Sequence, residues 1–494
     1  MSFDQHALSD AVESEAAMGS ESDGGHTMSR QTAIVVGVLL VASFVVILNE
    51  TIMSVALPSL MADLNISAAV AQWVTTGFLL TMAVVIPTTG LILQRFGTRS
   101  IFVAAMSLFT AGTALAAAAP GFGLLLTGRI LQASGTAIML PLLTTTVMSS
   151  VPERRRGRTV GLISIVIAVA PAVGPTISGV MLSSLGWRWL FLFVLPIAVL
   201  SLGIGARFVH SVSATRAIRV DVSSVLLSAI GFGGLIFGLS SIGEAAEGKA
   251  PVPVAVPMAV GVVALALFVA RQLRLQRTDA ALMDLRPFKS RTFAIGTVTL
   301  LVAMAVLLGT LVLLPIFMQS VLGMSTMRTG LLLLPGGLTM GLLAPLVGRI
   351  FDRYGARPAI IPGTLIIVAA LAAMAMLDRH VPALAVAGAH VLLSVGLALA
   401  LTPLMTATLG SLNPSQYSHG SAIVNTLQQL AGAAGTAMFV SIMTARSQQR
   451  VGAGIDHASL LATGTRSAFA WGAALALVAV IVSLFLPRPT STTS

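Results

Sequence analysis

The sequence predicts an all-α membrane protein of fourteen transmembrane helices, arranged as two six-helix bundles with two further helices inserted between them. Composition is the first reason. Hydrophobic residues make up 56% of the 494 positions and charged residues 9%, whereas charged residues are about 25% of a typical soluble protein. The 46 glycines and 22 methionines suit closely packed bilayer helices, because small residues let backbones approach. The other reasons are a series of apolar windows and an internal repeat.

Apolar windows of about 20 residues, long enough to cross a bilayer, recur along the chain. They predict fourteen spans, centred near residues 47, 81, 109, 136, 170, 199, 232, 262, 306, 338, 368, 395, 432 and 475. Most Lys and Arg residues fall in the loops of one side, which the positive-inside rule assigns to the cytoplasm together with both termini. The net charge of +11 therefore reflects topology, and no nucleic-acid partner is expected. We expect a multi-pass protein of the inner (cytoplasmic) membrane.

The internal repeat indicates duplication of a six-helix unit. Residues 90–99 read G-L-I-L-Q-R-F-G-T-R and residues 348–357 read G-R-I-F-D-R-Y-G-A-R, with Gly, Ile, Arg, Gly and Arg at matching positions. Both segments follow a long apolar run on the predicted cytoplasmic side. Parallel duplication of this kind places a transport site between the halves. The spacing of the two copies leaves two extra spans between the halves, near 222–242 and 252–269.

These features predict the organisation of the whole chain. The first 30 residues are acidic and polar, without the basic start or apolar core of a signal peptide. The expected segments are a disordered cytoplasmic tail at 1–30, an N-terminal six-helix bundle at 31–210, two inserted transmembrane helices at 220–272, a cytoplasmic linker at 273–291, a C-terminal six-helix bundle at 292–487, and a cytoplasmic tail at 488–494.

The first span, 35–57, carries a carboxylate where a membrane helix normally has none. Of the 17 acidic residues, Glu50 is the one predicted to lie inside a span. An ionised carboxylate at this depth costs a few kcal/mol, so it is normally neutral, paired, or exposed to a wet cavity. Glu50 is therefore the first candidate for proton chemistry within the membrane.

The same span carries a family resemblance. Leu48-Asn49-Glu50-Thr51-Ile52-Met53-Ser54-Val55-Ala56-Leu57-Pro58 resembles the first-helix pattern Leu-Asp-x-Thr-Ile-Val-Asn-Val-Ala-Leu-Pro of the fourteen-span drug:proton antiporters in the major facilitator superfamily, and is most similar to the lincomycin-exporter-like members. The acid of the family pattern falls on Asn49, so Glu50 lies one position later, about 100° round the helix. The resemblance covers residues 31–487 and implies the major facilitator fold, proton-coupled efflux and amphipathic drugs as substrates.

Two further motifs contribute to the resemblance. The repeat is similar to the superfamily loop motif Gly-x-Leu-Ala-Asp-Arg-x-Gly-Arg-Arg at Gly90, Arg95, Gly97 and Arg99, with Gln94 in place of the Asp; Asp352 and Arg353 occupy the second copy. In the family that Asp helps to lock one conformation. Gly174, Pro175 and Gly179 match the antiporter motif Gly-Pro-x-x-Gly-Gly, which in the family seals a leak path. An ordinary packing kink caused by this proline and these glycines is the alternative.

Arg129, in the sequence L-L-T-G-R-I-L-Q-A-S-G, matches the Arg of the superfamily's helix 4 motif. Glu50 and Arg129 each lie roughly 10 to 12 Å from the outer end of their spans at 1.5 Å per residue, so they could be at one level. A neighbouring Arg favours the ionised form of a carboxyl group, whereas loss of water favours the neutral form. Proton binding and release could therefore follow hydration of the cavity. The alternative is a permanent ion pair that holds two helices together.

The candidates for substrate binding are polar residues predicted to face a cavity: Asn49, Gln132, His390, Asn425, Gln428 and Gln429. Asn425 is three and four residues from Gln428 and Gln429, so one helix face can present these groups. Hydrogen bonding between helices without substrate contact is the alternative, and a lone His is commonly structural.

Proton-driven export by alternating access, with Glu50 as proton carrier and Arg129 in the coupling, is the leading hypothesis. The expected partners are the lipid bilayer, small amphipathic molecules and protons, for a monomer with no cofactor and no metal. One alternative is an exporter of a lipid or metabolite of the cell envelope. A membrane enzyme is disfavoured, because Gly-x-Ser-x-Gly and His-Glu-x-x-His are absent and His and acidic residues do not cluster within the predicted spans.

Overall fold

The computed structural model describes residues 29–66, 68–210, 221–242, 245, 252–278, 281–448 and 457–487. Within these residues the chain is helical, with no β-strand. Fourteen α-helices of 18 residues or more make up the described part: α2 (Arg30–Leu64), α3 (Ala68–Arg95), α4 (Thr98–Ala117), α5 (Phe122–Ser150), α6 (Glu153–Ser184), α7 (Arg188–Phe208), α8 (Val222–Ser240), α10 (Ala255–Leu275), α11 (Arg291–Ile316), α12 (Thr326–Tyr354), α13 (Arg357–Met374), α14 (Ala383–Gly410), α15 (Tyr417–Gln448) and α16 (His457–Leu484).

Each of the fourteen span centres expected from the sequence lies within one of these helices. Twelve helices of the described part are long and apolar enough to cross a membrane. The two long helices outside that set are α6, which begins in the Arg-rich segment 153–158, and α15, which carries Asn425, Gln428 and Gln429. The expected tails at 1–28 and 488–494 lie outside the described residues.

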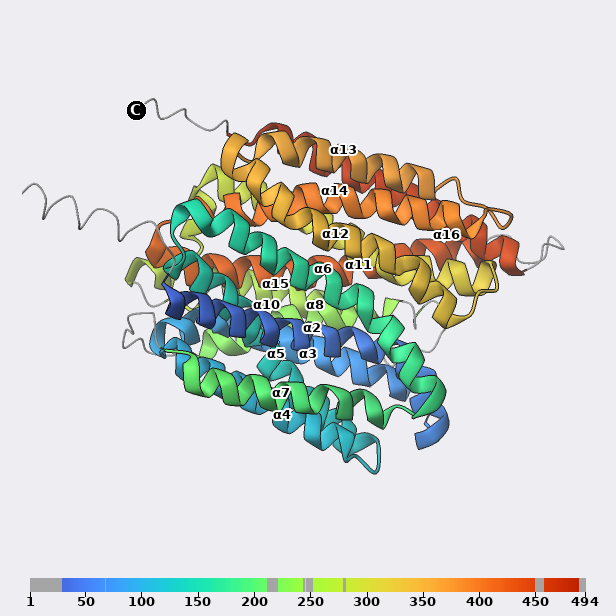
Figure 1. Ribbon diagram of the computed structural model, residues 1–494, viewed down its shortest axis with the longest axis horizontal. Coiled ribbons are helices and arrows are strands. Elements are labelled where there is room, and N and C mark those ends of the chain that lie inside the picture. The colour runs from blue at the N-terminus through green and yellow to red at the C-terminus, as the bar shows by residue number, and fades with distance from the viewer. Residues whose placement is uncertain are drawn as a thin grey trace, which may run out of the picture.

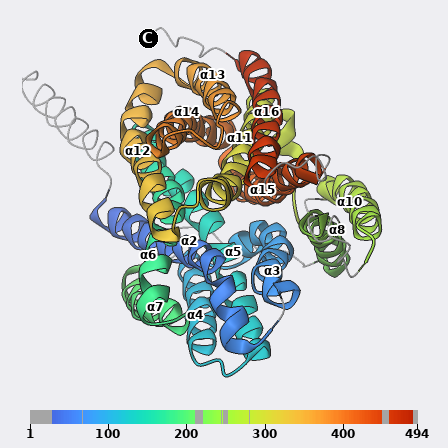
Figure 2. The same ribbon diagram turned by 90° about the vertical axis from the view of Figure 1, so that its right-hand side faces the viewer.

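The long helices run side by side, and the first and last described residues lie at the same end of the bundle (Figure 1). The helices form two sets by their mutual packing. Helices α2 to α7 pack on one another and form the N-terminal set, whereas α11 to α16 form the C-terminal set. The view along the helices separates the two sets (Figure 2). The most extensive packing between them is that of α6 on α12, and α3 also packs on α15.

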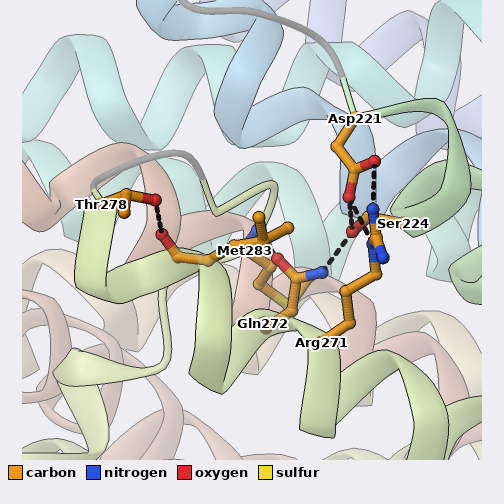
Figure 3. A network of polar contacts seen from close by, with 7 residues as sticks. Asp221, Ser224, Arg271, Gln272, Thr278 and Met283 are labelled. Carbon is orange, nitrogen blue, oxygen red and sulfur yellow. Dashed lines mark hydrogen bonds and ion pairs between the residues drawn. The ribbon is translucent and has the colours of Figure 1, made fainter.

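Helices α8 and α10 pair with each other at one edge of the molecule, where α8 packs on both α3 and α15 (Figure 2). A polar network fixes one end of this pair (Figure 3). Asp221 accepts from Arg271 Nε at 2.7 Å and Nη2 at 2.9 Å, and from Ser224 Oγ at 2.5 Å. Gln272 donates to Ser224 Oγ and accepts from the backbone N–H of Met283. The network therefore ties both helices to the segment that leads into α11.

Helix α2 extends beyond the predicted span, which ended before Pro58, and finishes at Leu64 with the left-handed residue Asn65 as C-cap. Its last turn is held from outside the helix. Asp63 Oδ2 accepts from Trp187 Nε1 and from Arg188 Nη1, each at 2.8 Å. Contacts to the start of α7 thus stabilise the last turn of α2, which lies beyond the end of the span predicted from the sequence.

Candidate functional site

Glu50 lies in the interior of α2, twenty residues after its first residue, Arg30, and fourteen before its last, Leu64. Every other carboxylate of the described residues is within one turn of a helix end or outside a helix. The side chain of Glu50 is half-buried, and its neighbours Asn49 and Leu48 are buried. Such a carboxylate is costly in a membrane interior unless it is neutral or compensated.

Arg129 enters the same region from α5, seven residues after the start of that helix at Phe122. It is 1% exposed and is among the largest fully buried side chains. Its guanidinium carbon lies 4.1 Å from the centroid of the Phe78 ring, and its Nε donates to Val74 O at 3.5 Å. Both partners belong to α3, so α3 and α5 together set the position of this charge.

Glu50 and Arg129 interact through their charges. Within the described residues no hydrogen bond or ion pair joins the two side chains directly. The two groups are therefore near neighbours without being locked together, which differs from the permanent ion pair considered as the alternative.

Gln132 occupies the next turn of α5 and is fully buried. Its Oε1 accepts from Arg129 Nη1 at 3.0 Å, and its Nε2 donates to Thr113 Oγ1 of α4 at 2.8 Å. Both ends of the Gln132 amide are thus engaged by protein groups, although the sequence suggested a substrate contact.

Helix α6 packs on the turn of α2 that carries Glu50. A β-carbon on Gly174 would collide with Thr51 Oγ1 and lie 3.1 Å from Thr51 Cβ, and Ser178 Oγ donates to Ile52 O at 3.0 Å. Gly179 has nothing within 4 Å of the corresponding position. Of the antiporter motif, Gly174 therefore makes the close approach, whereas the side chain of Pro175 lies outside the described residues.

A narrow cavity lies between the two helix sets. It is lined by side chains of α6, α11, α12, α14 and α15, namely Val160, Ile163, Leu300, Met304, Met340, Leu401, Met405 and Gln428. Gln428 is the polar member of this lining, and three thioethers supply adaptable apolar surface. The cavity volume of about 20 Å³ has room for about one water molecule, so a drug-sized molecule would require the helix sets to separate.

The remaining polar candidates have different surroundings. Asn425 is buried and donates to Ser421 O at 2.8 Å within α15, and Gln429 is half-buried. The Nδ2 of Asn49 is buried and has no hydrogen-bond partner among the described residues. His390 of α14 packs against Gly336 of α12, and its Nδ1 also lacks a hydrogen-bond partner in the described part.

The two copies of the loop motif lie at equivalent helix junctions, α3–α4 and α12–α13. Each begins with a glycine that packs on the opposite helix set. A β-carbon on Gly90 would lie 3.4 Å from Ala422 Cβ and from His419 Nδ1 of α15, and one on Gly348 would lie 2.8 Å from Gly157 O of α6.

The other members of the two copies lie near those junctions. Gly97 is the N-cap of α4. The charged members Arg95, Arg99, Asp352 and Arg353 are exposed, although Asp352 also packs directly on Gly157. The side chain of Gln94 lies outside the described residues.

Several contributors to the site carry no signal in the sequence. Thr113 accepts a hydrogen bond from Gln132, and the Phe78 ring packs against Arg129. A hydrogen bond of 2.5 Å between Thr144 of α5 and Ser421 of α15 joins the two helix sets. Threonine and serine hydroxyls in membrane helices usually bond to their own backbone, so such partners are indistinguishable in sequence from many others. No group of three or more His, Asp or Glu side chains in the described part could hold a metal ion.

Two sets of membrane-length helices, with the half-buried Glu50 and the buried Arg129 in one set and a cavity between the sets, define a class of protein. This is the architecture of secondary transporters built from repeated units. The family model of the Major Facilitator Superfamily matches residues 39–436. The chain belongs to the Major Facilitator Superfamily.

Relatives and a solved structure agree with this membership. The lincomycin resistance protein LmrB of Listeria monocytogenes is 40% identical over 477 residues, covering 95% of this chain and 100% of the relative. The multidrug resistance protein B homolog of Mycobacterium tuberculosis is 30% identical, covering 92% and 83%. The crystal structure of the human organic anion transporter MFSD10 has a TM-score of 0.65 at 16% identity, over 92% of this chain and 100% of that chain, which demonstrates a shared fold.

Proposed function

We propose that this protein exports small amphipathic molecules, antibiotics among them, across the bacterial cytoplasmic membrane in exchange for protons. The names of relatives with 30–40% identity, which refer to lincomycin resistance and multidrug resistance, support drug efflux. The cavity between the helix sets supports loose specificity, because flexible methionine-rich surfaces can adapt to ligands of different shapes.

The observation that carries the proton-coupled mechanism is the position of Glu50. It is the one carboxylate of the described residues in the interior of a helix, and it is half-buried. It interacts electrostatically with Arg129 without a direct hydrogen bond or ion pair to it. A carboxyl with these properties can bind and release a proton as hydration and neighbouring charge change. Glu50 binds the proton on one side of the membrane and releases it on the other as the helix sets move.

The proposed topology has fourteen spans. Helices α6 and α15 are 32 residues each, longer than the 20 or so residues that cross a bilayer, and both pack in the centre of the bundle on helices of the other set. The N-terminal and C-terminal sets act as two six-helix units, with α8 and α10 inserted between them. Both termini lie in the cytoplasm according to the distribution of Lys and Arg.

The proposed substrate site is the cavity lined by Gln428, Met304, Met340 and Met405. Asn49, Asn425, Gln429 and His390 are assigned to its extension, opened when the helix sets separate. The unpartnered amide nitrogen of Asn49 and ring nitrogen of His390 support this assignment, because a buried polar atom without a partner is destabilising unless a ligand or water can reach it.

Proton coupling can be tested in inside-out membrane vesicles under an imposed pH gradient, with ethidium and radiolabelled lincomycin as probes. Wild type should accumulate at least one probe, and Glu50→Gln should reduce gradient-driven accumulation to the level of vesicles without the protein. The exposed carboxylate of Asp378 provides the matched control, because Asp378→Asn removes an equal charge from the segment between α13 and α14, outside the cavity lining. Accumulation that persists in Glu50→Gln would remove Glu50 from the mechanism.

A second assay separates drug efflux from export of an envelope component. In proteoliposomes that contain the purified protein and a fluorescent analogue of a membrane lipid, the protein should transport drugs and should not transport the lipid analogue. Transport of the lipid analogue, together with no transport of any drug in a panel of test compounds, would favour the envelope-exporter alternative.

A further inference from the structure

A buried chain of hydrogen bonds leads from α4 to Arg129. Thr113 Oγ1 donates to Phe109 O at 2.7 Å and accepts from Gln132 Nε2 at 2.8 Å, and Gln132 Oε1 accepts from Arg129 Nη1 at 3.0 Å. Thr113, Gln132 and Arg129 are each at most 1% exposed. These polar groups are therefore bonded to protein partners and shielded from bulk water.

The chain has a fixed direction. A hydroxyl has one hydrogen, and Thr113 gives it to the carbonyl of Phe109 in its own helix. Thr113 can then only accept from Gln132, which must present its NH₂ group to Thr113 and its carbonyl oxygen to the guanidinium. The opposite amide orientation would place the amide NH₂ against the guanidinium and two oxygen acceptors against each other, so Thr113 and Arg129 together fix the orientation of the Gln132 amide.

Close packing of α4 on α5 makes this reach possible. A β-carbon on Gly112 would lie 2.6 Å from Gln132 N, and one on Gly128 would lie 2.8 Å from Gly112 O. These glycines precede Thr113 and Arg129 in the chain. The two backbones therefore approach at the level where the hydrogen-bond chain crosses between the helices.

The geometry points to Thr113 as a positioning residue for the proton step: through Gln132 it holds Arg129 against Val74 and Phe78, away from a direct ion pair with Glu50. This inference rests on the proposed function in one respect, the role of Glu50 as proton carrier. A direct ion pair would keep Glu50 ionised and idle, whereas a restrained Arg129 leaves the carboxylate free to exchange protons.

Among the described residues, the one charge that acts on Glu50 is that of Arg129. The elements packed on α2 are α3, α5, α6 and α7. Among the described residues of these helices, Arg129 of α5 is the charged group that acts on Glu50. The position of one guanidinium thus governs the electrostatic surroundings of the carboxylate.

The test is an infrared titration of purified protein in detergent, following the carbonyl band of a protonated carboxyl that is absent from Glu50→Gln. Thr113→Val preserves shape and removes the hydroxyl. It should free Arg129 to pair with Glu50 and move the titration midpoint to lower pH by about one unit, as for a carboxyl beside an Arg. Thr113→Ser should restore the wild-type midpoint, which loss of packing alone would not do.

Two more variants sharpen the test. Gln132→Glu gives Arg129 its own carboxylate and should move the Glu50 midpoint in the opposite direction, to higher pH. Thr136→Val is the matched control, because Thr136 is equally buried on α5 and its hydroxyl donates to the backbone oxygen of Gln132; it should leave the midpoint unchanged.

An unchanged midpoint in Thr113→Val, or equal shifts in Thr113→Val and Thr136→Val, would overturn the inference. If Thr113→Val fails to fold, Gln132→Glu decides, because a shift to lower pH or no shift would contradict the proposed restraint. The titration needs no substrate, so it is independent of the vesicle experiment. The two proposals can therefore fail separately. If Thr113→Val lowers the titration midpoint as expected but Glu50→Gln still transports in vesicles, proton coupling through Glu50 is refuted and the positioning of Arg129 by Thr113 stands.

Discussion

Asp352 of α12 lies directly against Gly157 of α6, so that its side-chain oxygens occupy the space a β-carbon on Gly157 would need. Gly157 belongs to the second turn of α6, which begins at Glu153. The partial positive charge of a helix end fades within the first turn, so this contact is one of close packing between the two helices. The contact joins the two helix sets at the end of the molecule that carries the loop motifs, so Asp352 can stabilise closure there.

Removing this carboxylate should open the proposed cytoplasmic side. Because the chain contains no cysteine, Gln428→Cys gives a single reporter in the cavity. Adding Asp352→Ala should accelerate its labelling by a membrane-impermeant thiol reagent in inside-out vesicles about 3- to 5-fold, since the loss of one side-chain contact typically costs about 1 kcal/mol. Asp378→Ala should leave the labelling rate unchanged, and equal rates in all three proteins would argue against a closing role for Asp352.

Removing the charge of Arg129 should shift the pH dependence of transport. Arg129→Met keeps an unbranched apolar side chain over Phe78 and leaves Glu50 without its charged neighbour. The transport profile should move to higher pH by about one unit or more, because an adjacent positive charge disfavours protonation of a carboxylate. Arg129→Lys should shift the profile less. Transport measured over a pH series in vesicles checks this, and an unchanged profile in Arg129→Met would reduce Arg129 to a packing role.

The contact of Gly174 with Thr51 predicts a steric effect next to Glu50. Gly174→Ala should destabilise the protein by about 1–3 kcal/mol through overpacking and lower transport. Adding Thr51→Ala removes the nearest atom, Oγ1, and should restore part of the loss. Gly179→Ala, at a position with open space, should be neutral. Thermal unfolding in detergent measures the series. Equal damage at both glycines would show that the contact with Thr51 is not the cause, since replacing glycine by alanine within a helix is by itself stabilising.

The ion pair between Asp221 and Arg271 predicts a pH-dependent contribution to stability. Hydrogen bonds from Arg271 and then from Ser224 lower the pKa of Asp221 to about 2, below the value of about 3.9 in an unfolded chain. A lowered pKa stabilises the fold at pH values above about 4, and this contribution disappears as the pH falls towards 2. Because Arg271 is 41% exposed, the effect on Tm should be small.

Asp221→Asn should lower the Tm of the detergent-solubilised protein by about 1–2 °C at neutral pH, in keeping with the modest worth of partly exposed ion pairs. The difference from wild type should shrink steadily between about pH 4 and pH 2. A difference that stays constant over this range would show that lost packing, rather than lost charge, is responsible.

Sequence alone determined the fold class and the principal candidates, because both depend on local properties of the chain. Membrane-length helices follow from runs of apolar residues, and each predicted centre lies in a long helix. Glu50 and Arg129 were recognisable since a charge inside an apolar run is costly wherever it points. The repeat at Gly90 and Gly348 likewise marked two junctions that the fold makes equivalent.

Tertiary structure alone decided which partners these residues meet. Thr113 resembles any other threonine in an apolar run until α4 and α5 approach through their glycines, and Gln132 resembles a cavity residue until both ends of its amide are occupied. The last turn of α2 likewise depends on Trp187 and Arg188, more than a hundred residues away. Such contacts depend on how helices rotate and cross, which is set by packing between distant segments and leaves no periodic signal in the sequence.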